Sequence, residues 1–276
     1  MIIAGFTVVT LRSPGDTAVP PFQQAETTNG DVVLRPIAYE IPDGAPAAGQ
    51  ALRDLASTIG STSYDGNRGT YAYHHLRSWG STRALGPGDR NMSLAQEMWT
   101  WSDANGVGES RVRELQPEFP DEESRQYWQE ILGKNGVQPA ATTSVVTSSG
   151  TVGPTKPVDP AALPITLQVE AGAPEVAKAV NGLYRSHVVP LETRKKIIQT
   201  IAAVPGFQWR GTVTDRSGRT GVAVTTDDEE HDVQLVLVFD RRTGELLAHE
   251  NVRLSGPRQV LAYNLFLEYG YRSSTD

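Results

Sequence analysis

The histidines are the first residues to test for chemistry, and they do not group as ligands. The chain of 276 residues has five: His74, His75, His187, His231 and His249. His74 and His75 are adjacent, so in a strand they point to opposite faces and cannot bind one metal ion together. No His-Glu-x-x-His motif occurs. We therefore predict no metal site and interpret the histidines as structural or solvent-exposed.

Acidic and nucleophilic residues show no catalytic arrangement either. Asp227-Asp228-Glu229-Glu230 places four acids side by side, whereas a calcium loop spaces its oxygen ligands at alternate positions around a glycine. A solvated turn that protects a sheet edge is the simpler interpretation. The Gly-x-Ser-x-Gly motif, cysteine and the glycine-rich phosphate motifs are all absent. We therefore predict no catalytic residue, no cofactor and no enzymatic activity.

The one distinctive pattern is aromatic. Tyr71 and Tyr73 share a face of a predicted strand, and Trp99 and Trp101 share a face of the next one. Aromatic pairs across strands contribute about 0.5–1.5 kcal/mol beyond the area that they bury, so core packing explains the pattern. The same four side chains could also line a pocket for an acyl chain or a hydrophobic peptide. They are the predicted ligand-binding residues.

Alternating apolar residues predict the strands that position these side chains. Turn sequences such as Asp215-Arg-Ser-Gly218 and Asp240-Arg-Arg-Thr-Gly244 follow closely on the strands. Strands joined by short hairpins are antiparallel, because a parallel partner needs a long crossover. The result is two meanders of about eight strands. The predicted strands span 69–79, 92–101, 108–115, 207–214, 220–226, 232–239, 245–254 and 261–271.

Apolar residues at helical spacing predict about four helices. One spans 46–59, one follows Pro120, and two lie between 159 and 205. Helices must cover one face of the sheet, or that face remains an apolar trough. We therefore predict an α+β fold in which a curved antiparallel sheet packs on the helices. Residues 46–272 form one domain with a flexible insertion at 136–157, and two separate domains are the alternative.

The net charge and the N-terminal segment of the chain indicate which kinds of partner it can have. The net charge of −7 argues against nucleic acid, and Arg194-Lys195-Lys196 is interpreted as a solvated helix face. Residues 1–10 are uncharged but too short to cross a bilayer, which needs about 20 in a helix. They are either a strand or the end of a membrane helix. With the extended, Pro/Gly-containing residues that follow, 1–45 are interpreted as a membrane-proximal leader and tether.

Short motifs spread over 46–272 resemble an uncharacterised actinobacterial family. They include Asp159-Pro-Ala-Ala-Leu163, Ile201-Ala-Ala-Val-Pro-Gly206, Thr243-Gly-Glu-Leu-Leu247 and Gly69-Thr-Tyr-Ala-Tyr73. Members commonly carry an N-terminal membrane helix and are often encoded beside extracytoplasmic-function sigma factors. The helices followed by a meander with an Asp-x-x-Thr-Gly-x-Leu hairpin are also similar to lipoprotein-carrier-like domains, which include periplasmic carriers and sensors of anti-sigma regulators. Both resemblances imply an extracytoplasmic protein, the first also implies a membrane anchor, and neither supplies catalytic residues.

Three functions are compatible with these observations. The first is a non-enzymatic sensor or carrier domain of the cell envelope that holds a lipid or acylated ligand or relays an envelope signal. The second is an interaction module that binds an envelope protein through an exposed sheet edge. The third is an unrecognised hydrolase, which would need a cleft that brings His74 or His75 close to an Asp or a Ser.

Overall fold

A single antiparallel sheet organises the chain. The structure is a computed structural model that describes residues 45–66, 69–83, 91–115, 117, 119, 122–134, 145–153, 158–256 and 260–275. Within these ranges nine strands lie in the order β4-β3-β2-β1-β9-β8-β7-β6-β5, and every neighbouring pair is antiparallel. The strands are β1 (Tyr71–Arg83), β2 (Asn91–Ser102), β3 (Val107–Glu114), β4 (Val145–Thr151), β5 (Gln208–Thr214), β6 (Thr220–Asp228), β7 (Val233–Phe239), β8 (Leu246–Arg253) and β9 (Val260–Arg272).

The predicted α+β class and the two meanders are confirmed. Strands β1–β4 form one meander and β5–β9 the other, and pairing of β1 with β9 joins them in one sheet. We call β1–β4 the N-terminal half-sheet. The sheet has one strand more than predicted because Val145–Thr151, expected to belong to a flexible insertion, pairs with β3 along its whole length. The part of that segment that precedes β4, and residues 1–44 of the leader predicted at 1–45, lie outside the described residues.

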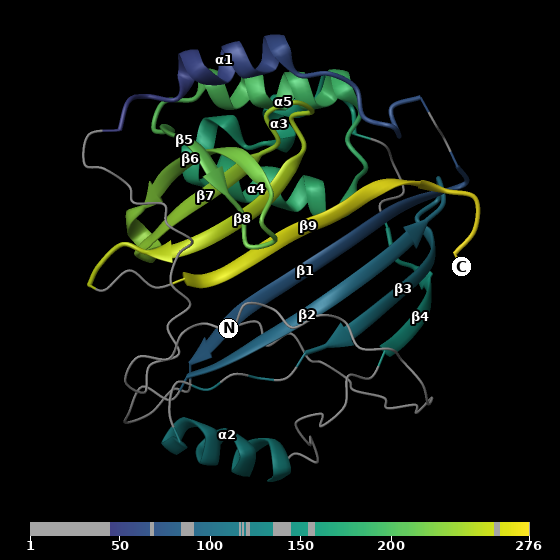
Figure 1. Cartoon of the computed structure of the whole chain (residues 1–276), viewed down its shortest axis with the longest axis vertical. Helices are drawn as coiled ribbons and strands as arrows, with labels where there is room; N and C mark the ends of the chain where they lie inside the picture. The colour runs from purple at the N-terminus through teal and green to yellow at the C-terminus, as the bar shows by residue number, and fades with distance from the viewer. Residues whose placement is uncertain are drawn as a thin grey trace.

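Four helices cover one face of the sheet at β5–β9, while the N-terminal half-sheet extends beyond them (Figure 1). These are α1 (Gly49–Thr58), α3 (Leu163–Thr166), α4 (Ala173–Ser186) and α5 (Leu191–Ala203), and α2 (Glu122–Lys134) contacts β2 instead. Two 3-10 turns, Val169–Ala171 and Glu229–His231, complete the described elements. We call the face under α4 the helix-side face. None of the described helices is long and apolar enough to span a bilayer.

The core lies between these helices and the sheet. In α4, Val176 and Val180 have no exposed surface, and in α5 the same holds for Ile197 and Ile201. They pack against helix-side residues of β6–β9 such as Leu237. Full burial of such a side chain contributes about 1.5–3 kcal/mol, so this layer stabilises the C-terminal half of the sheet in particular.

Strand β7 is buried on both faces. All seven of its residues are buried, and Val236 and Val238 belong to a second apolar cluster on the opposite face. That cluster also contains Trp79 and Tyr263, whose rings stack at 5.9 Å. Burial on both sides explains why β7 is an almost continuous apolar run instead of an alternating one.

The β7–β8 hairpin depends on one glycine. Gly244 has a φ of 70°, and a Cβ there would lie 2.5 Å from Cδ1 of Ile59. We expect Gly244→Ala to lower the free energy of unfolding by about 2–4 kcal/mol, because it adds a clash to the backbone strain. Gly218→Ala is the matched control, since Gly218 has a φ of 82° but no atom within 4 Å of the new Cβ. Urea denaturation should show that Gly218→Ala lowers the free energy of unfolding by about 1 kcal/mol. Equal losses of stability in the two variants would contradict the predicted clash at Gly244.

Candidate functional site

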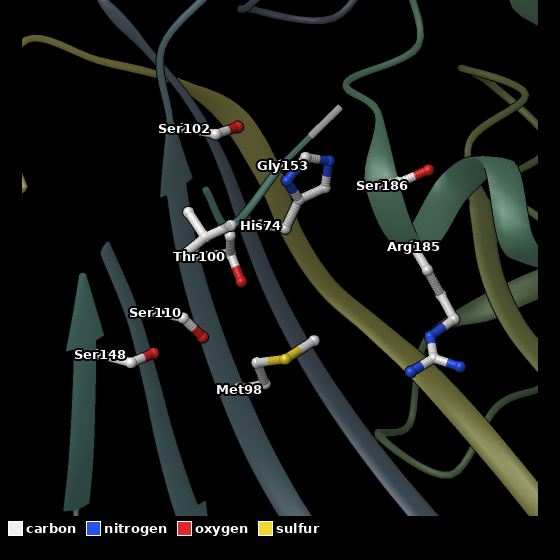
Figure 2. A pocket seen from close by; sticks show the side chains of 10 residues that line it. His74, Met98, Thr100, Ser102, Ser110, Ser148, Gly153, Arg185 and Ser186 are labelled. Atoms are coloured by element: carbon white, nitrogen blue, oxygen red, sulfur yellow. The ribbon is translucent and has the colours of Figure 1, made fainter. Parts of the chain in front are cut away.

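A hollow of about 430 Å³ lies between the end of α4 and the N-terminal half-sheet. It forms because α4 covers β6–β8 but leaves the helix-side face of β2–β4 open (Figure 1). Figure 2 shows side chains of neighbouring strands on one side and Arg185 and Ser186 of α4 on the other. The lining residues are His74, Met98, Thr100, Ser102, Ser110, Ser148, Val152, Gly153, Arg185 and Ser186.

A row of polar side chains crosses the floor of this hollow. The strand registers place Ser148 opposite Ser110, Ser110 opposite Thr100, and Thr100 opposite His74. Neighbouring strands lie about 4.8 Å apart, so the row leads from edge strand β4 to β1 over about 14 Å. Each hydroxyl can both donate and accept a hydrogen bond. The floor is therefore suited to a polar ligand.

The next row along the strands is apolar. Val146, Val112 and Met98 lie opposite one another, and Met98 lies opposite Leu76. Leu76 is buried and Met98 packs against the core. An apolar part of a ligand would therefore find contacts on one side of the polar row only.

His74 stands at the inner end of the polar row with an unsatisfied nitrogen. The residue is only 5% exposed, and its Nε2 has no hydrogen-bond partner among the residues that the structure describes. Burial lowers the pKa of His74 to about 4, against a backbone hydrogen bond with His187 that raises it. The ring also makes an edge contact with Tyr269 at 5.8 Å. At neutral pH the imidazole is uncharged, and its buried Nε2 has an unused capacity for a hydrogen bond.

Arg185 supplies the formal charge of the hollow. Its side chain projects from the last turn of α4, and the residue is exposed. Within the described part of the chain it makes no hydrogen bond or ion pair, and none of the described lining residues is a carboxylate. The hollow is therefore locally positive in a chain of net charge −7.

The geometry of the hollow gives little support to a hydrolytic or metal-dependent site. Ser186 Oγ lies 2.8 Å from Nδ1 of its neighbour His187, but no described carboxylate lines the hollow to orient an imidazole. Nε2 of His74 contacts no serine hydroxyl. Among the residues that the structure describes, no three His, Asp or Glu side chains gather as metal ligands.

The four predicted ligand-binding residues lie on the opposite face of the same strands. Tyr73 pairs with Trp101 at a ring distance of 5.2 Å, and Trp99 stacks on His75 at 4.8 Å. Tyr71 shares the strand parity of Tyr73. None of the four lines the hollow. Their role in ligand binding stays a prediction.

Arginines cover this aromatic face. The guanidinium of Arg111 lies 4.8 Å from the ring centre of Trp101, that of Arg113 lies 5.0 Å from Trp99, and that of Arg272 lies 4.3 Å from Tyr73. Such cation–π contacts contribute about 0.5–1 kcal/mol at exposed sites. The aromatic residues therefore have partners within the protein.

The hydroxyl row had only a faint signal in the sequence. Met98, Thr100 and Ser102 alternate with Trp99 and Trp101, so the face opposite the aromatic residues is the more polar one. Ser148 could not be placed beside Ser110, because its segment gives no strand pattern.

The fold defines the class of this chain: an α+β domain with one open antiparallel sheet and helices on one face. No family model matches it, and no curated protein matches it. Among solved structures it is similar to MucB, with 12% identity and a TM-score of 0.33 over 83% of this chain and 60% of that chain.

Two MucB complexes give similar values. MucB with MucA(peri) has 11% identity and a TM-score of 0.31, over 83% of this chain and 57% of that chain. The Pseudomonas aeruginosa MucA/MucB complex has 12% identity and a TM-score of 0.32, over 83% and 58%. This chain thus matches about three-fifths of the length of these MucB chains. TM-scores below 0.5 assign neither a family nor a function, and the actinobacterial and lipoprotein-carrier resemblances remain those of the sequence.

Proposed function

We propose that this chain is a non-enzymatic sensor domain of the cell envelope and that its ligand occupies the hollow beside α4. The observation that supports this is the buried, unpaired Nε2 of His74. A buried polar atom without a partner costs about 1–3 kcal/mol, and a ligand that bonds to it recovers that cost. The extracytoplasmic location and the membrane anchor rest on the sequence of residues 1–45 and on the two resemblances found in the sequence.

The ligand that this site favours differs from a purely hydrophobic one. Hydroxyls and an imidazole form the floor, and Met98 and Val152 supply the apolar part of the lining. A lipid or acylated ligand would fit only with its polar group over the row from Ser148 to His74. We therefore propose a polar or amphipathic ligand.

Blocking the hollow tests this function. Wild-type protein purified from a host with a cell envelope should carry a bound small molecule in native mass spectrometry, and Ser110→Trp should lose it because the indole fills the space. Thr212→Trp, on an exposed position of β5, is the control and should retain the ligand. Absence of bound mass from the wild type, or its persistence in Ser110→Trp, contradicts the proposal.

Strand β4 ends the sheet, and within the described residues its outer edge is unpaired, which favours a second function, binding of an envelope protein by strand addition. Its seven residues carry no charge and no proline, and all but Val146 are exposed. Natural edge strands are usually protected by charges, prolines, bulges or a covering segment. The other edge has such protection: β5 contains a register shift between Trp209 and Gly211, and Trp209 N donates to Pro46 O.

Photo-crosslinking distinguishes the two edges. A photoreactive residue at Thr147 of β4 should crosslink to one extended segment of an envelope protein, and the same residue at Thr212 of β5 should not. Ser149→Pro should abolish the crosslink, because proline removes a backbone donor from the strand. Equal crosslinking from both positions would count against strand addition.

A further inference from the structure

We propose that the hollow binds an anionic group, a carboxylate or a phosphate, and that His74 takes up a proton when the anion binds. This inference rests on the proposed function, because it names the chemistry of the ligand at the same site. It combines three observations: a cation at the rim that has no partner among the described residues, the hydroxyl row, and the buried imidazole at the end of that row.

The positive charge in the lining favours a negatively charged ligand. Arg185 is the only formally charged residue among the described lining residues. A guanidinium offers five N–H donors and binds carboxylate and phosphate oxygens through two of them at once. Because Arg185 has no ion-pair partner within the described residues, an incoming anion does not compete with an internal carboxylate.

The hydroxyls supply donors for the remaining anion oxygens. Thr100 and Ser110 are neighbours on the floor, whereas the hydroxyl of Ser186, on the α4 side, already contacts the carbonyl oxygen of Gly182. Ser and Thr hydroxyls rotate to donate toward a negative oxygen. Figure 2 shows Thr100 and Ser110 on one side of this space and Arg185 on the other. An anion between them would be bound from both the sheet and the helix.

The surroundings of His74 explain why a proton would accompany the anion. Three titratable or charged groups lie near it among the described residues. They are Arg185 in the last turn of α4, His187 directly after α4, and Tyr269 on β9. None of them is a carboxylate that could stabilise an imidazolium. With these neighbours alone the ring is neutral, and a bound anion would provide the missing opposite charge.

The sign of the pH dependence follows from this. The free protein keeps His74 unprotonated until the pH approaches about 4, whereas the anion raises the pKa in the complex. Between these two values the complex holds one more proton than the free protein. Affinity for the anion must then rise as the pH falls, by at most about tenfold per unit of pH.

The test uses acetate and inorganic phosphate as separate ligands at constant ionic strength, followed by NMR of the histidine ring signals of the folded chain. We expect at least one of them to shift the His74 signals saturably, more tightly at pH 5.5 than at pH 7.5. Saturation by acetate alone identifies a carboxylate, and saturation by phosphate alone a phosphate group.

Two matched variants make the result specific. Arg185→Gln should weaken binding about tenfold, because it removes a charge-assisted hydrogen bond, and it should fold normally because Arg185 is exposed. Lys196→Gln, an exposed cation on α5, should leave the affinity unchanged. His74→Gln should abolish the pH dependence.

Three outcomes overturn the inference: no saturable shift with either ion, equal weakening by Arg185→Gln and Lys196→Gln, or affinity that does not rise as the pH falls. A neutral ligand that native mass spectrometry finds on the wild type and not on Ser110→Trp would contradict the inference that the ligand is an anion. It would leave the proposed function intact. If neither anion binds and native mass spectrometry of the wild type shows no bound small molecule, the proposed function is contradicted as well.

Discussion

Replacing Arg194 by methionine is expected to lower the free energy of unfolding by about 3–5 kcal/mol. Arg194 has no exposed surface, although its neighbours Lys195 and Lys196 are accessible. The interpretation of this basic run as a solvated helix face is therefore wrong for Arg194. The helical period turns its side chain inward while the two lysines stay outside.

The reason for the large effect is the number of groups that Arg194 holds. Its guanidinium lies 2.7 Å from Oδ2 of Asp65 and donates to the carbonyl oxygens of Val189 at 2.7 Å and Thr243 at 2.8 Å. It also donates to the hydroxyl of Tyr64 at 3.0 Å. It thereby joins the loop after α1, helix α5 and the β7–β8 hairpin. Methionine fills similar space but leaves the Asp65 carboxylate and two carbonyls without this donor.

The pKa of Asp65 reports the same interaction. Burial raises this pKa, but hydrogen bonds from Arg194 and Thr62 outweigh burial and place it below its ordinary value. Lys195→Met is the control, since its ion pair with exposed Glu192 should contribute less than about 1 kcal/mol. Urea denaturation at pH 7 measures both variants. A loss below 1 kcal/mol for Arg194→Met would mean that the cluster does not stabilise the fold.

Acidification from pH 7 to pH 4 is the second change with a large expected effect. Burial lowers the pKa of both His74 and His249 to about 4, and the charge of Arg185 lowers that of His249 further. Unfolded histidines titrate near 6.5. Between these values the unfolded chain binds more protons, so stability is complete above about pH 6.5 and is lost as the pH falls toward 4. Each histidine contributes about 3 kcal/mol to this loss.

Thermal unfolding followed from pH 7.5 to pH 4 tests this expectation. The double variant His74→Gln and His249→Gln should lose most of the pH dependence in that window, because glutamine does not titrate. His231→Gln should keep it, since the side chain of His231 is 58% exposed and lies beside Asp228. A wild-type protein whose stability is flat down to pH 4 would contradict the buried, neutral state of both rings.

Local patterns in the sequence were sufficient for most elements of the fold. The hairpin glycines Gly218 and Gly244 have the positive φ expected of them, and the alternation at 261–271 corresponds to β9. These features depend on residues close together in the chain. The pairing of β1 with β9 and the position of β4 depend on distant residues, so periodicity alone could not supply them.

The candidate site could be predicted much less well. Serines and threonines are compatible with a strand on either face, and only the register shows that Ser148, Ser110 and Thr100 form one row. The helix that closes the hollow comes from a later part of the chain, and its apolar stripe does not reveal where Arg185 will lie. Buried histidines look the same in sequence as solvated ones, because burial is a property of their tertiary surroundings.

The central pairing of the sheet has a consequence for biosynthesis. Tyr71 of β1 lies opposite Arg272 of β9, which is the first described strand against the last. While the chain is being synthesised, one edge of β1 lacks this partner until β9 has emerged. Contacts between such distant residues slow folding and prolong the exposure of unpaired edges. A holdase chaperone that binds extended apolar segments should therefore raise the yield of folded protein for this chain. The increase should be larger than for a β-protein whose strands are joined only by hairpins.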